Sequence, residues 1–461
     1  MKITVIGTGY LGATHAACMA ELGHEVLGLD IDPAKIERLS GGSVPFYEPG
    51  LDELLVKHVA GHPGSSGRLR FTTDWAEAAA FGDVHFVCVS TPQRQGEFAC
   101  DMSFVDAAVD SLAPLLDRPA LVVGKSTVPV GSAARLAERL ATLAPAGAEV
   151  ELAWNPEFLR EGFAVQDTLR PDRIVVGVRD GGLAGAGAGA AGDGGGSGSR
   201  GEALLRELYA PLIEAGSPFL VTDYPTAELV KTAANSFLAT KISFINAMAE
   251  VCEASGADVV QLSKALSYDD RIGGRFLNAG VGFGGGCLPK DIRAFMARAG
   301  ELGADQALSF LREVDSINMR RRSRMVELAR EQCGGGFLGR RIAVLGAAFK
   351  PDSDDVRDSP ALNVAAQIQL QGGTVTVYDP KAVDNARRVF PGLCYADSAE
   401  EAAKGAHVVL HLTEWREFRE MDPAEFGQVV TERRIVDGRN VLDPERWRAA
   451  GWTYRALGRP S

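Results

Sequence analysis

Short apolar runs alternate with helix-like amphipathic segments along most of this chain. The first apolar run, residues 2–6, precedes a glycine-containing loop and an apolar helical pattern over residues 13–22. A second run, residues 25–29, completes a strand–helix–strand unit. This alternation predicts a parallel sheet whose faces are covered by helices.

The loop between the first strand and helix has the sequence GTGYLG, and the second strand ends in Asp30. Glycines at these positions permit a tight turn and a close approach of a pyrophosphate to the helix N-terminus, while the acid can bind ribose hydroxyls. An acid rather than an arginine cluster favours NAD over NADP. The predicted cofactor-binding residues are therefore Gly7, Gly9, Tyr10, Leu11, Gly12, Asp30 and the nearby Lys35.

Two further predicted strands, residues 84–89 and 121–124, end in polar segments that contain Thr91 and Thr127. Ligands of open α/β sheets lie outside the carboxyl ends of the strands, so both threonines are candidates for the nicotinamide side of the cofactor. A hydroxyl residue near proline is also a common turn, which is the structural alternative.

A predicted strand reaching Trp154 opens into the segment NPEFLREG. Glu157 and Glu161 stand four residues apart, so a helical turn after Pro156 would place both carboxylates on one face. Two carboxylates aimed one way can orient a water molecule or a sugar hydroxyl. The alternative is a solvated acidic start of a helix. Farther along, residues 181–201 are rich in glycine and alanine and predict a flexible surface insertion.

Residues 226–255 form a long helical pattern without glycine or proline. It is expected to connect two halves of the chain, and its apolar flanks offer a dimer surface. Lys231 and Asn235 lie one helical turn apart and share a face, where an ammonium and an amide can bind a developing oxyanion. A surface lysine is the ordinary alternative.

A glycine run leads directly to Cys287, which is followed by Lys290 and Asp291. Glycines let the backbone approach a ligand closely. A thiol with charged neighbours is a candidate for an activated nucleophile. An arbitrary lone cysteine is more often a small buried apolar residue. The local sequence favours the nucleophile here.

After an arginine-rich helix over residues 320–330, the pattern of the first sheet begins again. Residues 341–346 resemble residues 2–7, and residues 373–380 resemble residues 23–30. The fold class expected is α/β, with two doubly wound, Rossmann-like domains joined by a long central helix and a helical middle domain. The predicted bounds are 1–221 for an NAD-binding domain, 222–332 for a helical domain that supplies the dimer contact and Cys287, and 333–461 for a C-terminal α/β domain.

The first loop of the second sheet, GAAFKPDSDDVRDSP, lacks the GxGxxG spacing, so it is not expected to hold a second dinucleotide. Three cations at strand ends, Lys350, Arg357 and Arg439, instead suit a diphosphate or the edge of the NAD. Ordinary surface ion pairs are the alternative for each of them.

Composition excludes several classes of function. The 461 residues are 46% hydrophobic and 23% charged, as in globular proteins, and the net charge of −12 argues against nucleic-acid or anionic-membrane partners. The 7 cysteines are scattered without a CxxC pair, which argues against disulfides and zinc and fits a reducing cytoplasm. His58 and His62 stand four apart but run into Pro63, and we expect a solvated turn there rather than a metal site.

Seven motifs together resemble the UDP-glucose 6-dehydrogenase family and the wider family of nucleotide-sugar 6-dehydrogenases, which includes GDP-mannose and UDP-N-acetylmannosamine enzymes. These motifs are GTGYLG, STP, KSTVPVG, NPEFLREG, ELVKTAANSFLATKISFIN, GFGGGCLPKD and AAFKPDSDDVRDSP. The resemblance runs from Met1 to about Asn440, apart from the glycine-rich segment. The segment around Cys287 looks more like the UDP-glucose branch.

The resemblance implies that a primary alcohol at C6 becomes a carboxylate while two NAD⁺ are reduced. Cys287 would add to the bound aldehyde, and hydride transfer from the thiohemiacetal would leave a thioester for hydrolysis. Lys231 and Asn235 would stabilise the oxyanion, and Asp291 would position or activate water. Thr127 and Glu161 would order that water.

The resemblance also implies the substrate and partner contacts. Glu157 would contact substrate or assist hydrolysis, Arg357 would reach NAD, and Arg271 would reach the substrate of a neighbouring subunit, which implies a homodimer or a higher homo-oligomer. The residues expected at the UDP-sugar are Glu157, Phe158, Leu159, Lys231, Asn235, Arg271, Phe276, Gly284, Lys350 and Arg439.

Two departures from the family pattern affect the expected diphosphate or uridine contacts. Gly286 stands where many relatives carry serine, and Asn278 stands where some carry lysine. The leading hypothesis is NAD-dependent oxidation of UDP-glucose. The alternatives are the same chemistry on another nucleotide sugar and a non-catalytic regulator that binds a nucleotide sugar.

Overall fold

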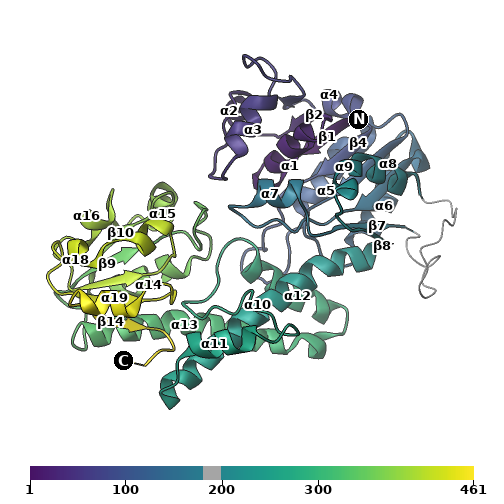
Figure 1. The fold of residues 1–461 in the computed structure, drawn as a ribbon. Helices are drawn as coiled ribbons and strands as arrows, with labels where there is room; N and C mark the ends of the chain where they lie inside the picture. Colours follow the sequence, from purple (N-terminus) through teal and green to yellow (C-terminus); the bar gives the residue numbers. More distant parts are fainter. Residues whose placement is uncertain (180–198, 461) are drawn as a thin grey trace. The chain divides into compact units, whose positions relative to one another are not determined.

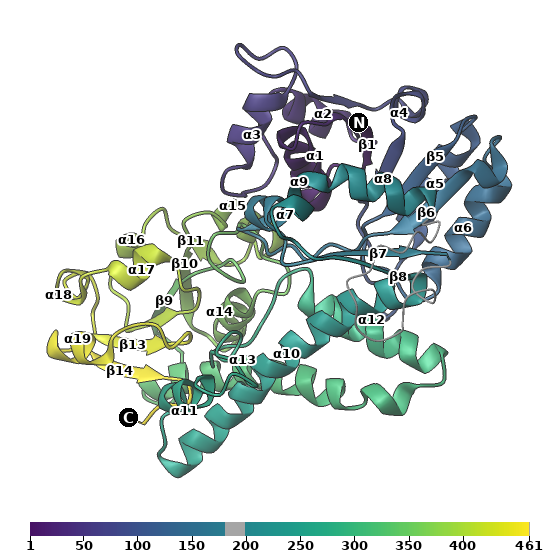
Figure 2. The same ribbon diagram turned by 45° about the vertical axis from the view of Figure 1, so that its right-hand side comes forward.

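The computed structural model describes residues 1–179 and 199–460, which divide into two compact units, Met1–Ala234 and Asn235–Ser461 (Figures 1 and 2). We call them the N-terminal and the C-terminal unit. The boundary falls inside one long helix, α10 (Tyr224–Ser255), close to the helix predicted from the sequence. The finer division into three domains stays a prediction.

The described part of the N-terminal unit contains an eight-stranded sheet in the order β3-β2-β1-β4-β5-β6-β7-β8. Its first six strands follow the order of a dinucleotide-binding fold. Neighbouring strands are parallel except β6 and β7, which are antiparallel, so the sheet is not wholly parallel as the pattern predicted. The strands are β1 (Lys2–Ile6), β2 (Glu25–Leu29), β3 (Leu69–Thr72), β4 (Val84–Val87), β5 (Ala120–Gly124), β6 (Val150–Trp154), β7 (Ile174–Val178) and β8 (Phe219–Asp223).

Helices cover both faces of this sheet because its strands alternate apolar residues between two cores. Ile3 and Val5 of β1 pack into one core with α1, whereas Ile6 packs into the other with α5 and α6. The helices of the unit are α1 (Tyr10–Glu21), α2 (Pro33–Ser40), α3 (Leu51–His58), α4 (Trp75–Phe81), α5 (Ser103–Leu112), α6 (Ser132–Leu143), α7 (Ala164–Leu169), α8 (Arg200–Leu208) and α9 (Ala210–Glu214), with 3-10 turns at Ala113–Leu115 and Gly147–Glu149.

The C-terminal unit contains a six-stranded parallel sheet in the order β11-β10-β9-β12-β13-β14. Counted from its own first strand, this is again the order 3-2-1-4-5-6, which confirms the predicted second doubly wound sheet. The strands are β9 (Arg341–Leu345), β10 (Thr374–Tyr378), β11 (Cys394–Tyr395), β12 (Val408–His411), β13 (Arg434–Asp437) and β14 (Thr453–Ala456).

A helical part of the same unit precedes this sheet. It comprises the second part of α10 with α11 (Val259–Ser267), α12 (Leu288–Glu301), a 3-10 turn at Asp305–Leu308 and α13 (Phe310–Gln332). Met325, Leu328 and Ala329 of α13 pack into the core of the sheet. The helices around the sheet are α14 (Pro360–Leu370), α15 (Val383–Val389), α16 (Ala399–Ala403), α17 (Arg416–Glu420), α18 (Pro423–Phe426) and α19 (Pro444–Ala449).

Several local expectations need correction. The first helix begins at Tyr10, three residues earlier than predicted, and β4 ends at Val87 rather than at residue 89. Most of the predicted glycine-rich insertion, residues 181–198, lies outside the described residues. Its predicted end is wrong, because the hydroxyl of Ser199 caps α8 and the helix already includes Arg200 and Gly201.

His58 is the other correction. It is buried at the end of α3, where its ring nitrogens contact Ser66 and Glu21 at 2.8 and 2.6 Å, so it is not part of a solvated turn. Within residues 1–179 and 199–460, no cluster of three His, Cys, Asp or Glu side chains could hold a metal ion. The helices of the described chain also include none that is long and apolar enough to span a bilayer.

Candidate active site

The glycine loop after β1 is shaped for a close phosphate approach. Gly7 has φ +86°, and a Cβ there would lie 2.8 Å from Val89 Cγ1. A Cβ on Gly12 would lie 1.8 Å from the carbonyl oxygen of Gly7, so strand and helix can meet only without a side chain at this position. A Cβ on Gly9 would meet nothing within 4 Å. The space in front of Gly9, at the N-terminus of α1, fits a dinucleotide pyrophosphate.

Asp30 lies at the end of β2, as predicted, and its carboxylate is fixed by the same loop. Its Oδ2 accepts hydrogen bonds from the backbone N and Oγ1 of Thr8 at 2.9 and 3.1 Å and from Lys35 Nζ at 2.8 Å. Burial opposes ionisation of Asp30, but the hydrogen bonds from Lys35 and Thr8 outweigh it, so the pKa of Asp30 is lowered. A fixed anionic carboxylate at this position suits a ribose diol. Leu11 follows Tyr10 in the first turn of α1.

The loops that carry Thr91 and Thr127 are joined at the ends of β4 and β5. The hydroxyl of Ser126 donates to the carbonyl oxygen of Val89 at 2.6 Å. Thr91 is buried and Thr127 is half-buried. Next to Ser126, the ammonium of Lys125 donates to Asn155 Oδ1 at 2.9 Å. These contacts bring the polar ends of three neighbouring strands together, as expected for a site at the carboxyl edge of a sheet.

The segment after β6 forms no helical turn over residues 155–160, so the condition under which Glu157 and Glu161 would share a helical face is not met. Glu157 folds back on the chain and accepts from the backbone N of Leu159 at 2.6 Å. Its other oxygen pairs with Lys231 Nζ at 2.8 Å, and both side chains are largely buried. The ring of Phe158 lies 3.9 Å from the guanidinium carbon of Arg173 and 5.9 Å from Lys231 Nζ. Glu157, Phe158 and Lys231 are thus brought together.

Glu48 ties this loop to the glycine loop, and the sequence motifs did not identify it. The carboxylate of Glu48 is 5% exposed and accepts from the hydroxyl of Tyr10 and from the backbone N atoms of Gly162 and Ala164, each of these two at 2.7 Å. Burial and the nearby Glu48 raise the pKa of Tyr10 above its ordinary value, so the phenol stays protonated and donates. A carboxylate beside Pro49 and Gly50 carries no signal of a partner 114 residues away.

Glu228 is a second buried acid, and the sequence analysis assigned it no role although it begins the motif ELVKTAANSFLATKISFIN. It accepts from the backbone N of Gly131 and of Ala133, each at 2.7 Å, at the start of α6. Glu228 therefore fixes α10 against the segment that follows Thr127, three residues before Lys231.

Cys287 lies at the N-terminus of α12, in the C-terminal unit, and is half-buried. Asp291, one turn farther along, is 2% exposed and accepts from Asn235 Nδ2 at 2.6 Å and from Lys290 Nζ at 2.6 Å. Asn235 of α10 and Lys290 and Asp291 of α12 thus form a polar cluster in which Asn235 and Asp291 are buried and Lys290 is half-buried. Such a cluster can hold the Asp291 carboxylate in a fixed orientation.

The loop before Cys287 is anchored by its backbone. Asn318 Oδ1 accepts from the backbone N of Phe283 at 2.7 Å, and Asn318 Nδ2 donates to the Phe283 carbonyl oxygen at 3.0 Å. The backbone N of Gly280 donates to Asn246 Oδ1. The backbone N of Gly285 donates to the carbonyl oxygen of Arg357. Glycines are needed because a Cβ on Gly282 would lie 2.3 Å from Asn318 Oδ1, and one on Gly284 would lie 2.4 Å from the carbonyl oxygen of Asp358.

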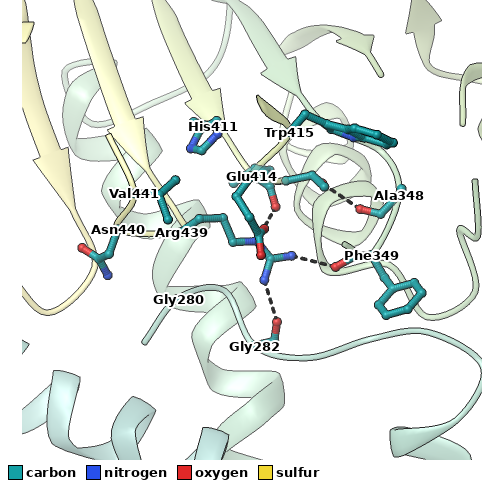
Figure 3. A network of polar contacts seen from close by, with 12 residues as sticks. Gly280, Gly282, Ala348, Phe349, His411, Glu414, Trp415, Arg439, Asn440 and Val441 are labelled. Atoms are coloured by element: carbon teal, nitrogen blue, oxygen red, sulfur yellow. Dashed lines mark hydrogen bonds and ion pairs between the residues drawn. The ribbon is translucent and has the colours of Figure 1, made fainter. Parts of the chain in front are cut away.

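Arg439 connects this loop to the second sheet (Figure 3). Its guanidinium donates to three backbone carbonyl oxygens, those of Leu412 at 2.7 Å, Phe349 at 3.0 Å and Gly282 at 3.2 Å. It also pairs with Glu414 at 3.2 Å, and its side chain is 12% exposed. The predicted cation at the strand end is therefore present, but its donors engage the protein itself.

The other predicted substrate residues of this unit are placed differently. Arg271 is 89% exposed and makes a two-pronged contact with Asp269 at 2.7 and 3.0 Å. Phe276 has φ +64°, a conformation that bulky residues rarely adopt. Asn278 is exposed in the same loop. Lys350 lies with Nζ 5.6 Å from the ring centre of Phe349.

Gly286, the residue before Cys287, is contacted by Arg357. A Cβ on Gly286 would lie 2.2 to 2.5 Å from the guanidinium atoms of Arg357. Asp355 holds the same guanidinium through Nη2 at 2.6 Å. The guanidinium thus takes the space that a serine side chain would need, which connects the unusual Gly286 with the predicted NAD contact Arg357.

The comparisons with known proteins agree with this architecture. Three family models match in order: the NAD binding domain of the UDP-glucose/GDP-mannose dehydrogenase family over residues 1–188, the central domain of that family over residues 225–320, and its UDP binding domain over residues 343–444. The fold and the glycine loop thus define an NAD-dependent dehydrogenase with two doubly wound sheets.

Relatives match the chain over its whole length. It is 41% identical to a UDP-glucose 6-dehydrogenase of Rhizobium meliloti over 460 residues, which cover 100% of both chains. It is likewise 41% identical to a UDP-glucose 6-dehydrogenase of Rickettsia prowazekii, with 99% of each chain covered. The solved UDP-glucose dehydrogenase of Pyrobaculum islandicum is 35% identical and has a TM-score of 0.86, with 100% of this chain and 98% of that chain covered. The chain belongs to the UDP-glucose/GDP-mannose dehydrogenase family, and the predicted family is confirmed.

Proposed function

We propose that the chain catalyses the NAD-dependent oxidation of UDP-glucose at C6 to UDP-glucuronate. The observation that carries the proposal is Cys287 at the start of α12, followed one turn later by the Asn235–Asp291–Lys290 cluster. The matched NAD binding domain and the UDP-glucose 6-dehydrogenases to which the chain is similar over its full length support the cofactor and the reaction.

The reaction needs two oxidations and one hydrolysis. Bound NAD⁺ supplies the hydride acceptor in each oxidation. After the first, the C6 alcohol has lost a hydride and a proton and is an aldehyde. The thiol sulfur of Cys287 then adds to the aldehyde carbon, and the second oxidation converts the thiohemiacetal into a thioester. Water adds to the thioester carbon, the thiol leaves and a carboxylate remains. The sugar stays covalently held, so the aldehyde is not released.

The residues assigned to the reaction fit these steps. Asp291 accepts hydrogen bonds from Asn235 and Lys290, which fix its carboxylate in a position to orient a water molecule. Lys231 and Asn235 stand one turn apart on α10, where an ammonium and an amide can share the charge on a C6 oxygen. Glu157 holds Lys231 in place and is assigned to the substrate loop with Phe158 and Leu159. Thr127 and Glu161 are assigned to the hydrolytic water.

The choice of UDP-glucose rests on the curated relatives. A solved UDP-N-acetylmannosamine dehydrogenase of Pyrococcus horikoshii is also similar, with a TM-score of 0.82 and full coverage of this chain but 27% identity. The alternative is therefore the same double oxidation on another nucleotide sugar. A non-catalytic regulator fits poorly, because Cys287, Lys231, Asn235 and Asp291 are all present.

We further propose that the chain acts as a homodimer or a higher homo-oligomer. Phe237, Phe244 and Val251 on α10 are 67%, 47% and 57% exposed and stand seven residues apart, so they form one apolar stripe along the helix. A second copy of the chain suits such a stripe. Arg271, in the exposed loop after α11, is assigned to a partner's substrate. The cytoplasmic location stays a prediction from the cysteine pattern.

The decisive measurement is the number of NADH formed per sugar consumed, with UDP-glucose, GDP-mannose and UDP-N-acetylmannosamine supplied separately. Two NADH per UDP-glucose, with little from the others, would establish reaction and substrate. One NADH per sugar would mean a simple alcohol oxidation and remove the role of Cys287. The Cys287→Ser variant is expected to bind NAD and UDP-glucose but to stop before the second oxidation is complete. The exposed Cys394, changed to serine, is the matched control.

A further inference from the structure

Glu48 is a buried carboxylate that lies far in sequence from every segment it holds. It comes from the loop between α2 and α3, and its two oxygens accept hydrogen bonds from three directions. Oε2 accepts from the Tyr10 hydroxyl and from the backbone N of Gly162 at 2.7 Å, and Oε1 accepts from the backbone N of Ala164 at 2.7 Å. The ring of Phe46 packs against Tyr10 in a tilted arrangement, with centroids 5.0 Å apart.

The partners of Glu48 belong to two functional segments. Tyr10 is the first residue of α1 and belongs to the glycine loop that is shaped for the pyrophosphate. Gly162 directly follows Glu161 and closes the loop that contains Glu157, which holds Lys231. The backbone N of Gly162 also donates to the Tyr10 hydroxyl at 3.0 Å. One carboxylate and one phenol thus join the cofactor loop to the loop assigned to substrate and water.

A buried carboxylate is costly unless its oxygens are satisfied, and here hydrogen-bond donors surround it on several sides. The described chain places the Tyr10 hydroxyl and backbone donors of Gly162, Ala164 and Val165 within hydrogen-bond distance. A movement of either loop alone would leave backbone donors or the buried Glu48 carboxylate without hydrogen-bond partners. The two loops therefore have to move together.

We propose that Glu48 is a positioning residue that couples cofactor binding to substrate binding through the Tyr10–Glu48–Gly162 contacts. Cofactor in the glycine loop fixes Tyr10, Tyr10 fixes Glu48, and Glu48 fixes the loop from Glu157 to Gly162. The sugar nucleotide then meets a loop that is already ordered. The inference rests on the proposed function, because it takes the loop from Glu157 to Glu161 as part of the substrate site.

The coupling is measurable as a ratio of binding constants. The dissociation constant of UDP-glucose is measured by calorimetry on the wild-type protein with and without saturating NADH, which binds without permitting turnover. We expect NADH to tighten UDP-glucose binding by a factor in the range of about 5 to 150, the usual span of a coupling between two sites. By reciprocity, UDP-glucose tightens NADH binding by the same factor.

Glu48→Gln and Tyr10→Phe are the test variants. Glutamine keeps the shape of Glu48 but turns an amide toward the backbone donors, and phenylalanine keeps the packing on Phe46 but removes the hydroxyl. In both, with NADH raised until the variant is saturated, we expect NADH to change UDP-glucose binding by less than about twofold. Glu53→Gln, on the exposed face of α3, is the matched control and is expected to keep the wild-type factor.

The outcomes separate this inference from the proposed function. A wild-type protein that does not bind UDP-glucose would overturn both. A wild-type protein that yields two NADH per UDP-glucose, but shows no coupling, would overturn only the role of Glu48. Wild-type coupling in Tyr10→Phe would also overturn the role of Glu48. This variant tests the proposal even if circular dichroism shows that Glu48→Gln does not fold.

Discussion

Arg439 Nη1 donates a hydrogen bond to the carbonyl oxygen of Gly282, 3.2 Å away and 157 residues earlier in the chain. The same guanidinium reaches the carbonyl oxygen of Phe349 (Figure 3). It also donates to the carbonyl oxygen of Leu412. Gly282 belongs to the glycine-rich loop that ends at Cys287. The position of the proposed nucleophile thus depends on a side chain that follows β13, the fifth strand of the second sheet.

Arg439→Lys is expected to lower the free energy of unfolding by about 1 to 3 kcal/mol, because one ammonium cannot satisfy three buried carbonyl groups in these directions. Chemical denaturation measures the loss. Arg416→Lys is the control, because Arg416 is 86% exposed and pairs only within α17, and surface changes of this kind stay within about 0.5 kcal/mol. A variant of Arg439 with unchanged stability and only a raised KM for UDP-glucose would favour the substrate contact first predicted from the sequence.

Local signals explain what the sequence predicted well. The glycine loop, Asp30 and the strand starts at Lys2, Glu25 and Arg341 depend on residues that are neighbours in sequence, so their pattern is readable. The order of strands in both sheets follows from the rules for parallel α/β connections.

Long-range polar contacts were not predictable. Glu48 reaches Gly162, and Arg439 reaches Gly282, but nothing near either residue indicates the partner. The loop at Glu157 is a further example. The spacing of Glu157 and Glu161 is compatible with a helical turn, but the segment forms a loop in which Glu157 pairs with Lys231, a partner that the local sequence does not indicate. Tertiary ion pairs override local propensity at such positions.

The glycine loop predicts opposite outcomes for two alanine variants. In Gly12→Ala the new Cβ would lie 1.8 Å from the Gly7 carbonyl oxygen, so α1 must shift and both stability and NAD binding should fall. In Gly9→Ala the Cβ meets no protein atom, and the φ of −70° is accessible to alanine. We expect this variant to melt within a few degrees of wild type but to bind NAD at least about tenfold more weakly, a loss of about 1.4 kcal/mol.

Thermal melts and NAD titrations of the two variants test this prediction directly. If Gly9→Ala binds NAD as tightly as the wild type, the pyrophosphate does not pass close to Gly9. If Gly12→Ala is as stable as the wild type, α1 can move away from the Gly7 carbonyl group at no cost in stability. The prediction that Gly12→Ala is less stable than Gly9→Ala is then wrong.

Gly286→Ser tests the contact with Arg357. The serine Cβ would lie 2.2 Å from the guanidinium carbon, so Arg357 must leave its place beside the residue that precedes Cys287. Because a nearby cation favours the thiolate, its departure should slow alkylation of Cys287 by iodoacetamide at neutral pH. We expect the alkylation rate to decrease by about threefold to tenfold.

The alkylation experiment uses a Cys394→Ser background, because Cys394 is the other cysteine that is not buried. Arg357→Ala should slow alkylation by a similar factor, and Arg357→Lys should restore part of the rate. The double variant Gly286→Ser/Arg357→Ala should be alkylated at about the same rate as either single variant. Additive effects in the double variant would mean that serine acts on Cys287 independently of Arg357.

Lys125 gives a prediction about pH. It is buried beneath the carboxyl edge of the first sheet, and burial lowers its pKa from the ordinary 10.5 to about 8. Between these two values the unfolded chain binds a proton that the folded chain does not, so the free energy of unfolding rises with pH. Below pH 8 both states are protonated, and the folded state bears the full cost of a buried ammonium, which donates to Asn155 at 2.9 and 3.4 Å.

Lys125→Met removes the titration while keeping an unbranched side chain of similar length. From pH 7 to pH 9.5 the stability of the wild type relative to this variant should rise by about 2 kcal/mol, since one pKa unit corresponds to 1.36 kcal/mol. Urea denaturation of both proteins at a series of pH values measures the difference, and groups unaffected by the substitution cancel in it. Lys264→Met, at an exposed position of α11, should give a difference that is flat with pH. A flat difference for Lys125→Met as well would mean that the buried ammonium stays charged throughout this range.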